Sequence, residues 1–348
     1  MQLNSLSLTN FRNYDDFALD FEPLTVLVGP NGVGKTNLLE AVYQIAVFSS
    51  YRARSSKDSI RWGQEFSRIV GQTNNTSVEL FIDQKLNKSI KINGVEKKTI
   101  DALGQLVVVL FSPESLDIVS GAPQERRRFM NLLLGQTDKE YARSLISLNH
   151  ILANRNRLLY RIKTNLAKTD ELDFWDQELI KLNKIITEQR QILIDLINQN
   201  LTNYYQLISG SDDKLIAKYK KRADGKILDQ LLIANRDQEI NQTTTLYGPH
   251  RDELIFYLND YLIGAGWSRG ELRSAVLALK MSELGYLEKV HQGEITLLLD
   301  DVFSELDKER RSHLLELVSK HQTIITTTDK EHLGKDIIKK AKIVELGK

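Results

Sequence analysis

A glycine-rich turn followed by a lysine and a threonine lies near the N-terminus, and these residue types suit phosphate. Residues 26–43 read VLVGPNGVGKTNLLEAVY, and the pattern predicts a strand at 24–28 before the turn and a helix at 37–47 after it. The backbone N–H groups of such a turn wrap phosphate oxygens, while Lys35 reaches the β- and γ-phosphates and the Thr36 hydroxyl ligates Mg²⁺. We therefore predict a P-loop for ATP and Mg²⁺, built from Gly29, Pro30, Asn31, Gly32, Val33, Gly34, Lys35, Thr36 and Asn37.

Two aspartates end an apolar strand pattern far downstream, where residues 296–301 read TLLLDD. A P-loop needs a carboxylate at the end of a neighbouring strand to hold the Mg²⁺ shell, so we expect Asp300 to support the metal together with Thr36. Asp301 stands where a carboxylate orients or deprotonates the attacking water. Because aspartate is shorter than the glutamate common at that position in related ATPases, we expect slow hydrolysis and no other catalytic activity.

A third motif, WSRGELRSAVLALKMSEL at 267–284, places Ser268 and Gly270 before an amphipathic helix and about thirty residues before the TLLLDD strand. It resembles the signature motif of ABC-type ATPases, in which the serine hydroxyl, glycine amides and helix N-terminus bind the γ-phosphate held by the opposite subunit. Alone, Ser268 is more simply a helix N-cap. Beside a P-loop and SELD at 304–307, we expect Ser268 to join Lys35 and Asp301 as a catalytic residue.

The elements around these motifs predict an α/β fold with a helical insertion. Short strand patterns fill the first hundred or so residues, long helical patterns run from Gln124 to about Leu207, and strand patterns return from about Glu253. We therefore expect an ABC-type ATPase head at 1–115 and 245–348, interrupted by a mainly helical lobe at 116–244. An apolar seam within 174–201 favours helix packing in that lobe over a long coiled coil, because it is too short for sustained heptads.

Composition limits the classes of protein. The chain has 348 residues, a net charge of +1 and no cysteine. This length allows about two domains, the charge requires any nucleic-acid surface to come from local clusters, and disulfides and cysteine metal sites are excluded. The N-terminus lacks a basic and apolar leader pattern, and the longest apolar run is too short to span a bilayer. We expect a cytoplasmic protein without membrane contact.

Together the motifs resemble the RecF family of ABC-type recombination mediators in bacterial DNA repair. The likeness runs from end to end through LTNFRNY at 8–14, the P-loop, SSYRARSS at 49–56, FSPESLDIVSGAPQERRRFMN at 111–131, YGPHRDEL at 247–254, SRGELRS and LLLDDVFSELDKERR at 297–311. The resemblance implies a head that dimerises around two ATP molecules, binds duplex DNA or a single-strand/duplex junction, and acts with RecO and RecR to load RecA at gaps. It also implies that Arg12 approaches the adenine.

The chain departs from this family in two places. The signature reads Ser268-Arg269-Gly270-Glu271 where the family usually has Ser-Gln-Gly-Gln, and Asn131 replaces an aspartate. The related SMC and Rad50 proteins need hundreds of coiled-coil residues between the ATPase halves, which this length excludes.

Arginine and lysine clusters supply candidate DNA contacts, although each is also consistent with an ordinary solvated face. We select Arg52, Arg54 and Lys57, then Arg126, Arg127 and Arg128, and further consider the helix-spaced Arg155, Arg157 and Arg161 and the run KYKKR at 218–222. Tyr14 suits either core packing or the adenine. His250 and Arg251 match a family motif without a chemical role that the sequence assigns.

Two other functions remain open at this point. An ABC transporter ATPase subunit is disfavoured because Thr328 stands where transporters carry the switch histidine and FSPES has no Q-loop glutamine. An ATP-gated scaffold that recruits repair proteins without binding DNA itself fits the same motifs.

Overall fold

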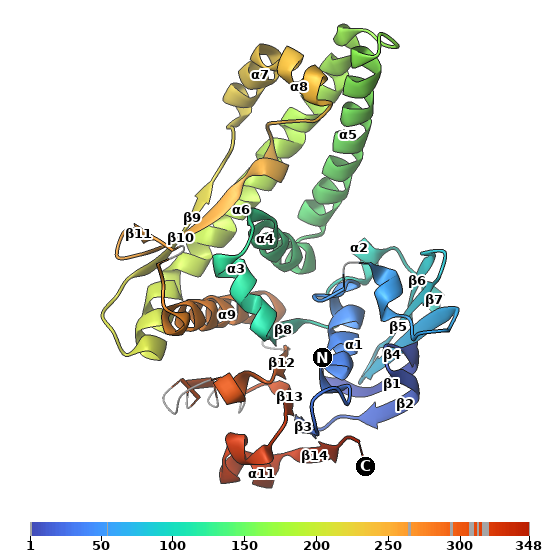
Figure 1. Ribbon diagram of the computed structural model, residues 1–348, viewed down its shortest axis with the longest axis vertical. Coiled ribbons are helices and arrows are strands. Elements are labelled where there is room, and N and C mark those ends of the chain that lie inside the picture. The colour runs from blue at the N-terminus through green and yellow to red at the C-terminus, as the bar shows by residue number, and fades with distance from the viewer. Residues whose placement is uncertain are drawn as a thin grey trace. The chain divides into compact units, whose positions relative to one another are not determined.

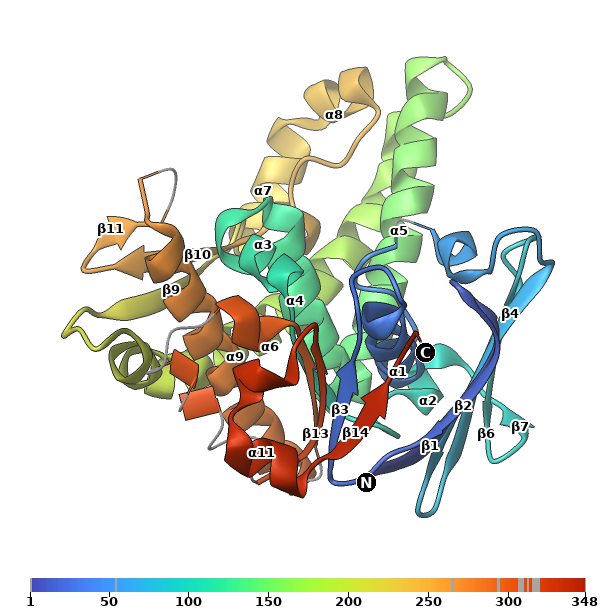
Figure 2. The same ribbon diagram turned by 60° about the horizontal axis from the view of Figure 1, so that its bottom comes forward.

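The computed structural model describes residues 2–53, 55–263, 266–292, 295–305, 310–311, 313–314 and 320–347. Its contacts divide the chain into two compact units. Unit 1 comprises Met1–Leu116, Asn203–Asp212 and Ser268–Lys348, and unit 2 comprises Asp117–Thr202 and Asp213–Trp267. Figures 1 and 2 show the elements of each unit in two views.

Unit 1 contains a six-stranded antiparallel sheet in the order β2-β1-β4-β5-β6-β7. Apolar residues alternate along its strands, so one face is buried and the other meets solvent, as Val78, Leu80 and Ile82 show on β5. The strands are β1 (Leu3–Phe11), β2 (Tyr14–Asp20), β4 (Phe66–Thr73), β5 (Ser77–Asp83), β6 (Lys88–Ile92) and β7 (Val95–Glu96).

The second sheet of unit 1 is parallel and has the order β14-β3-β13-β12-β8. Its inner strands are continuous apolar or threonine runs, which is typical of a sheet covered on both faces. The carboxyl ends of parallel strands meet at one edge, so the turn after β3 and the aspartates after β12 are brought together, with β13 between them. The strands are β3 (Leu24–Val28), β8 (Val108–Phe111), β12 (Thr296–Asp300), β13 (Gln322–Thr327) and β14 (Lys342–Glu345).

Helix α1 (Lys35–Val47) connects the two sheets of unit 1. It contacts β8, β12 and β13 of the parallel sheet and β1, β4 and β5 of the antiparallel sheet, and nearly all of its residues are buried. The other helices of this unit are η1 (Ser56–Ser59), α2 (Thr99–Ala102), η2 (Pro113–Leu116), α9 (Arg269–His291), η5 (Val302–Glu305), η6 (Lys330–Leu333) and α11 (Lys335–Lys340).

Unit 2 is mainly helical and holds one small antiparallel sheet of order β11-β10-β9. Its helices are α3 (Asp117–Ser120), α4 (Pro123–Thr137), α5 (Lys139–Lys163), η3 (Thr169–Glu171), α6 (Leu172–Ser209), α7 (Gly225–Ala234), α8 (Arg236–Gln242) and η4 (Pro249–Arg251). The last turns of α6 belong to unit 1. The strands are β9 (Leu215–Lys220), β10 (Glu253–Leu258) and β11 (Tyr261–Leu262). No helix in the described part of the chain is long and apolar enough to cross a membrane.

The second boundary between the units differs from the expected one near residue 245. Strand β10 pairs with β9 from Glu253↔Lys220 to Leu258↔Leu215, so residues 245–267 group with unit 2 and the chain re-enters unit 1 at Ser268. The strand pattern at 253–262 had been assigned to the ATPase lobe because a strand pattern does not reveal its partner strand.

Arg155 was one of the helix-spaced candidates for DNA contact, and the structure contradicts that expectation. Its side chain is fully buried, with Nε 2.8 Å from Asp176 Oδ1 and Nη2 2.6 Å from Glu239 Oε2, and its Nη1 donates to Thr245. Arg157 is exposed on the same helix. Arg155 therefore ties α5 to α6, α8 and the segment after α8.

The GPHRD segment has a structural role that the sequence did not assign. Asp252 is fully buried and accepts hydrogen bonds from the Tyr219 hydroxyl and the Arg222 backbone, and burial raises its pKa. Arg190 donates to the carbonyl of Pro249 at 2.7 Å and to Asn131 at 3.0 Å. Asn131, the residue that departs from the family, therefore remains a hydrogen-bond acceptor.

Candidate nucleotide site

The turn after β3 leaves the N-terminus of α1 open to an anion. Gly34 is the N-cap with φ 114°, no side chain caps the helix, and the first turn carries no acidic residue. The first-turn N–H groups of such a helix need partners, and the helix dipole favours a negative one. A Cβ at Gly34 would lie 2.6 Å from Tyr14 Oη and from Asn13 Nδ2, so only glycine fits here.

Lys35 lies over this turn. Its Nζ is 2.6 Å from the carbonyl oxygen of Gly29 and 2.9 Å from that of Pro30. Burial lowers the pKa of Lys35, while the neighbouring carboxylates of Asp301 and Asp300 oppose that shift. These bonds hold the Lys35 ammonium next to the turn whose backbone N–H groups would bind phosphate oxygens.

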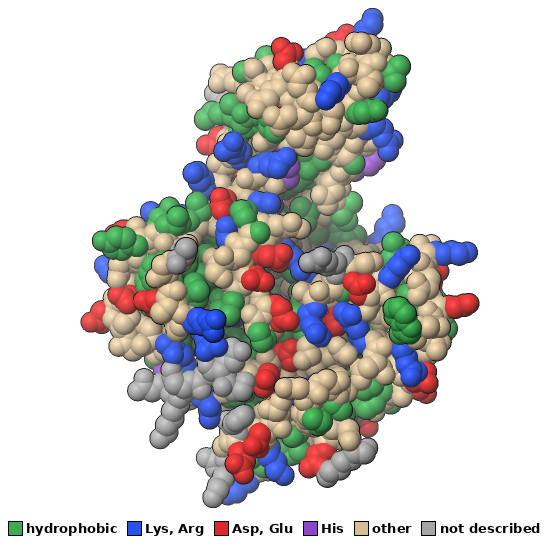
Figure 3. All heavy atoms as spheres, viewed as in Figure 1, with side chains coloured by type: hydrophobic (Ala, Val, Ile, Leu, Met, Phe, Trp, Pro, Cys, Tyr) green, Lys and Arg blue, Asp and Glu red, His purple; other side chains and the backbone are tan. Residues whose placement is uncertain are grey.

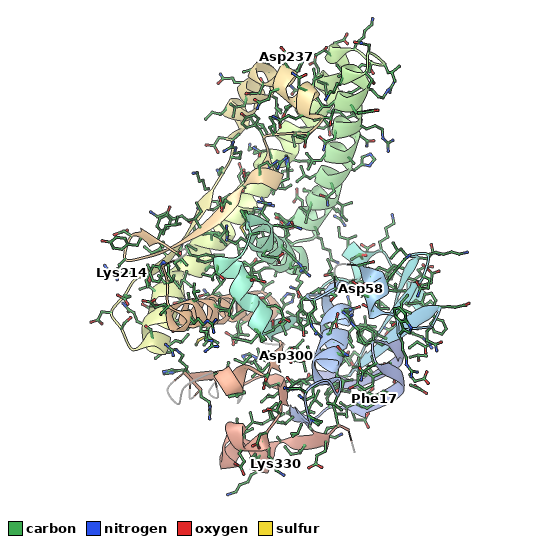
Figure 4. The ribbon with its side chains drawn as sticks, viewed as in Figure 1. Phe17, Asp58, Lys214, Asp237, Asp300 and Lys330 are labelled. Carbon is green, nitrogen blue, oxygen red and sulfur yellow. The ribbon has the colours of Figure 1, made fainter. Side chains whose placement is uncertain are left out.

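Asp300, labelled in Figure 4, lies at the end of β12 beside the start of α1. The Thr36 hydroxyl donates to its Oδ1 at 2.9 Å, Thr326 of β13 donates to the same oxygen at 2.7 Å, and Tyr51 donates to Oδ2 at 3.3 Å. The structure thus brings together Thr36 and Asp300, which lie 264 positions apart in the sequence.

Asp301 follows with φ 51°, a left-handed conformation that aspartate tolerates better than most residues. Its backbone N–H donates to the hydroxyl of Thr326 at 3.0 Å. Thr326 therefore fixes both aspartates at the strand ends. Burial, with Asp300 adding to it, raises the pKa of Tyr51 well above its ordinary value, so its hydroxyl remains a donor.

The residues present fit a hydrated Mg²⁺. A threonine hydroxyl and a carboxylate oxygen are the hard ligands that this ion prefers, and it usually takes one or two protein groups together with phosphate oxygens and water. In the described residues there is no group of three or more His, Cys, Asp or Glu side chains arranged for a metal. Such a site would therefore depend on Thr36, Asp300 and the phosphates.

Arg12, expected at the adenine, is held by a carboxylate that sequence reasoning missed. Its Nε and Nη2 lie 3.0 and 2.6 Å from the two oxygens of Glu40, which is fully buried on α1. Arg52 approaches the same carboxylate at 3.8 Å and donates to Asn37 at 3.2 Å. A charged residue inside the apolar run LLEAVY was the available signal for Glu40.

Ser268 and Gly270 lie at the start of α9 in unit 1. The Ser268 hydroxyl accepts from the Glu271 backbone at 3.2 Å and donates to the Glu271 carboxylate at 2.7 Å, and the carboxylate also accepts from the Ser268 backbone at 2.8 Å. This reciprocal arrangement is a capping box. The N-cap interpretation therefore holds within one chain, and a role toward a second chain stays a prediction.

The DNA candidates differ in their surroundings. Arg126 donates to Gly121 and pairs with Glu253 at 2.6 Å, and Arg127 donates to the backbone of Asp252 at 3.0 Å. Both anchor α4 to the start of β10, which makes them poor phosphate contacts. Arg128 lies 3.9 Å from Glu125, and Arg54 lies outside the described residues.

Exposed cations remain in both units. Lys57 is exposed on η1 of unit 1, while Lys218, Lys220 and Arg222 are exposed on and after β9 of unit 2. Figure 3 shows Lys and Arg side chains dispersed over the visible face among acidic ones, as expected for a nearly neutral chain.

Comparison with known proteins identifies the family. The chain is 34% identical to the DNA replication and repair protein RecF of Halalkalibacterium halodurans, over 99% of this chain and 98% of that protein. It is 36% identical to RecF of Lactobacillus johnsonii, over 99% and 97% of the two chains. The chain belongs to the RecF family. The model of the AAA ATPase domain also matches residues 1–340.

Solved structures confirm the predicted fold. The structure of the recombination mediator protein RecF with ATP, from the RecFOR pathway, has a TM-score of 0.89 and 30% identity, and the match covers 94% of this chain and 92% of that one. An Smc head domain from Pyrococcus furiosus matches with a TM-score of 0.54 at 15% identity, over 95% of this chain and 90% of that one. The chain therefore has the ABC-type ATPase head fold shared by RecF and Smc heads.

Proposed function

We propose that this RecF-family chain is an ATP-dependent switch of recombinational DNA repair and replication restart. ATP and Mg²⁺ bind at the P-loop and close a homodimer, closure assembles a DNA-binding surface, and slow hydrolysis resets the protein. The observation that carries the proposal lies at the carboxyl ends of the parallel strands. There the uncapped N-terminus of α1 lies beside the Thr36 hydroxyl, which donates to Asp300 at 2.9 Å.

Each side chain of this edge has a defined task in the proposal. Lys35 leaves the carbonyls of the turn and pairs with the β- and γ-phosphates. Thr36 and Asp300 hold Mg²⁺, which neutralises phosphate charge when bound. Asp301, fixed at its backbone by Thr326, orients the attacking water.

Ser268 and Gly270 act on the nucleotide of the second chain. The N-terminus of α9 offers the same physical attraction for an anion as that of α1. The γ-phosphate of one chain would then lie between its own Lys35 and the partner's Ser268, so nucleotide and dimerisation depend on each other.

The proposed partners are inferred from the proteins that this chain is similar to. The curated relatives are named as DNA replication and repair proteins, and two similar solved structures are described as RecF in the RecFOR pathway. We infer that the chain works in the cytoplasm, with RecO and RecR, to load RecA at gapped DNA. The candidate DNA contacts of unit 1 are Lys57 and Arg52, and unit 2, taken by itself, offers Lys218, Lys220 and Arg222.

The test measures duplex and gapped-DNA affinity over a series of salt concentrations, with and without ATP. Without nucleotide, binding should be weak and mildly salt-dependent, because the chain has a net charge of only +1. With ATP and Mg²⁺ the slope of log K against log salt should steepen by roughly 0.9 for each added phosphate contact.

The Lys35→Met variant is the control for this measurement and should behave identically with and without ATP. Equal slopes for the unmodified protein in both conditions would overturn the ATP-gated model. Absence of DNA binding in both conditions, with ATP-dependent dimerisation retained, would favour the scaffold function instead.

A further inference from the structure

Trp62 presents a large aromatic ring to solvent at a place where the fold does not use it. It is 98% exposed, the most exposed of the large apolar side chains in the described residues. It lies in unit 1, between η1 and β4. A single exposed apolar side chain is ordinary on a protein surface, so the significance of this ring depends on the backbone that displays it and on the groups beside it.

The backbone on both sides of this ring is held in place. Ile60 is buried and forms a bridge to Phe11 at the end of β1, and the N–H of Arg61 donates to the carbonyl of Asn10 at 2.8 Å. The N–H of Gln64 then donates to the carbonyl of Arg61 at 3.0 Å, which closes a turn with Trp62 at its second position. The ring is therefore displayed by a fixed turn.

The third position of this turn requires glycine. Gly63 has φ 82°, which places it where a type II turn requires the left-handed region. A Cβ at Gly63 would meet no atom within 4 Å, so backbone conformation alone explains the residue. The turn Arg61-Trp62-Gly63-Gln64 is thus fixed by its backbone hydrogen bond and by Gly63. Its conformation does not depend on packing of the indole ring.

A cationic hollow of about 940 Å³ adjoins the ring. Its lining includes Arg12, Arg52, Lys57 and Arg61, with Asp58 as the acidic residue among them. Arg12 is neutralised by Glu40, and Arg61 by Asp15 at 2.8 Å. Lys57 has no ion-pair partner among the described residues and is exposed. Figure 4 labels Asp58, and Figure 3 shows Lys and Arg side chains on the surface around that position.

The open aromatic face lies beside the exposed Lys57 and beside Arg52, whose guanidinium is only loosely paired, 3.8 Å from Glu40 and 3.7 Å from Glu114. An aromatic face next to cations matches the chemistry of a nucleic-acid strand whose bases are unpaired. We propose that Trp62 stacks on a base of single-stranded DNA while Lys57 and Arg52 contact the adjoining phosphates. Bases inside a duplex have no free face, so duplex DNA cannot use the ring in this way. A single adenine would cover the ring but leave most of the hollow unfilled, whereas a strand occupies both.

This inference rests on the DNA-binding part of the proposed function and makes it specific. It places a single-strand contact on the surface beside the nucleotide site, since Asn13 and Asn37 also line the hollow. Asn13 donates to the P-loop carbonyl of Val33 and accepts from Asn37. One unit would then contact both the nucleotide and the unpaired strand of gapped DNA.

The experiment compares oligothymidylate with an abasic oligonucleotide of equal phosphate number, at low salt and in the presence of ATP. Stacking on an aromatic ring typically changes affinity by about 5- to 150-fold per base on alanine substitution. Trp62→Ala should therefore weaken oligothymidylate binding within this range and leave abasic binding unchanged. Trp62→Phe should restore part of the loss, because a smaller aromatic face remains.

Tyr261→Ala is the matched control, since Tyr261 is an aromatic residue 76% exposed on β11 of unit 2. It should leave both affinities unchanged, and the thermal unfolding midpoint of Trp62→Ala should match that of the unmodified protein because the ring packs against little. ATP affinity without DNA is measured on the same variants.

Four outcomes would overturn the inference. Unchanged oligothymidylate affinity in Trp62→Ala removes the stacking contact, and an equal loss for the abasic strand assigns the effect to phosphate attraction. Loss of ATP affinity with normal oligothymidylate binding assigns the ring to the adenine. If the unmodified protein binds neither strand nor duplex, the DNA-binding part of the proposed function fails as well.

Discussion

At the scale of single residues, Thr326 organises the chemistry at the edge of the parallel sheet. Its hydroxyl donates to Asp300 Oδ1 at 2.7 Å and accepts from the N–H of Asp301 at 3.0 Å. One fully buried side chain on β13 thereby fixes the carboxylate proposed for Mg²⁺ and the backbone of the residue proposed for the water. Thr326 is thus a positioning residue.

Thr326→Val should keep the shape of the site and remove both hydrogen bonds of the hydroxyl, while the N–H of Asp301 keeps the backbone carbonyl at this position as an acceptor, at 3.2 Å. A hydrogen bond to a charged group contributes ~1.5–3 kcal/mol, so we expect ATP turnover to fall at least about tenfold while nucleotide affinity changes little. Single-turnover hydrolysis and equilibrium nucleotide binding measure the two quantities.

Thr323→Val is the matched control, because Thr323 is equally buried on β13 but donates to the carbonyl of His321. It should leave turnover near that of the unmodified protein. Similar losses in both valine variants would show that β13 tolerates no such change and that Thr326 has no special role.

Residue patterns predicted the strand, glycine turn and helix around the P-loop sequence because the requirements of this turn are local. Glycines, Lys35 and Thr36 must follow one another to wrap a phosphate, so spacing alone identifies them. The contacts of Glu40 with Arg12 and of Thr326 with Asp300 join residues 28 and 26 positions apart, and no sequence spacing announces them. The prediction for Arg155 was wrong for a related reason. The sequence does not show whether an arginine is exposed or is buried against carboxylates from distant segments.

At the scale of elements, α9 begins with a serine whose hydroxyl is already occupied by Glu271. A γ-phosphate arriving at this N-terminus would meet the carboxylate of Glu271 as well as the helix dipole. The capping box therefore stabilises the free helix and opposes the anion, which would set a threshold ATP concentration for the proposed dimerisation.

Glu271→Gln should lower that threshold. Glutamine keeps the reciprocal capping contacts and removes the charge, and a charge in the first turn of a helix changes anion affinity by roughly two- to fivefold. We expect the ATP concentration for half-maximal dimerisation, followed by light scattering, to fall by that factor.

The control for α9 is Glu140→Gln, which removes the same charge from the first turn of α5 in unit 2. It should leave the dimerisation midpoint unchanged. A higher midpoint in Glu271→Gln would contradict the account and show that the carboxylate assists closure.

Helix α5 offers a prediction on stability. Arg155→Ala leaves the carboxylate of Glu239 buried without its cation, while Asp176 keeps its pair with Arg236 at 2.8 Å. Leaving a buried charge unpaired typically costs about 3–5 kcal/mol. Arg157→Ala, on the exposed side of the same helix, should stay within about 0.5 kcal/mol of the unmodified protein. Urea unfolding measures both, and equal stabilities of the two variants would contradict the structural role of Arg155.

The types of the elements could be predicted from hydrophobic periodicity, because buried parallel strands and amphipathic helices have distinct patterns. The periodicity did not predict which strands pair with each other. Residues 253–258 had the correct strand pattern, yet their pairing with 215–220 depends on contacts between segments nearly forty residues apart. This is why the return to unit 1 was expected near residue 245 and occurs at Ser268.

At the scale of the whole molecule, we propose an active site that a second chain completes. In this proposal the P-loop, Asp300 and Asp301 form one half within unit 1, and Ser268 at the N-terminus of α9 supplies the other half to a partner. The Lys35→Met change removes the phosphate cation, and Ser268→Arg removes the contribution to the opposite site. Each variant alone should therefore lack ATPase activity, and Lys35→Met alone should also fail to dimerise with ATP.

Mixing these two variants tests whether Ser268 of one chain completes the nucleotide site of the other. In a heterodimer, the P-loop of the Ser268→Arg chain meets the intact Ser268 of the Lys35→Met chain, so one of the two sites is complete. The measurement is ATPase activity of the mixture, with heterodimer formation verified by differently tagged chains. The account predicts activity on mixing that neither variant shows alone, whereas no activity despite verified heterodimers would place Ser268 outside the active site and contradict the ATP-closed dimer.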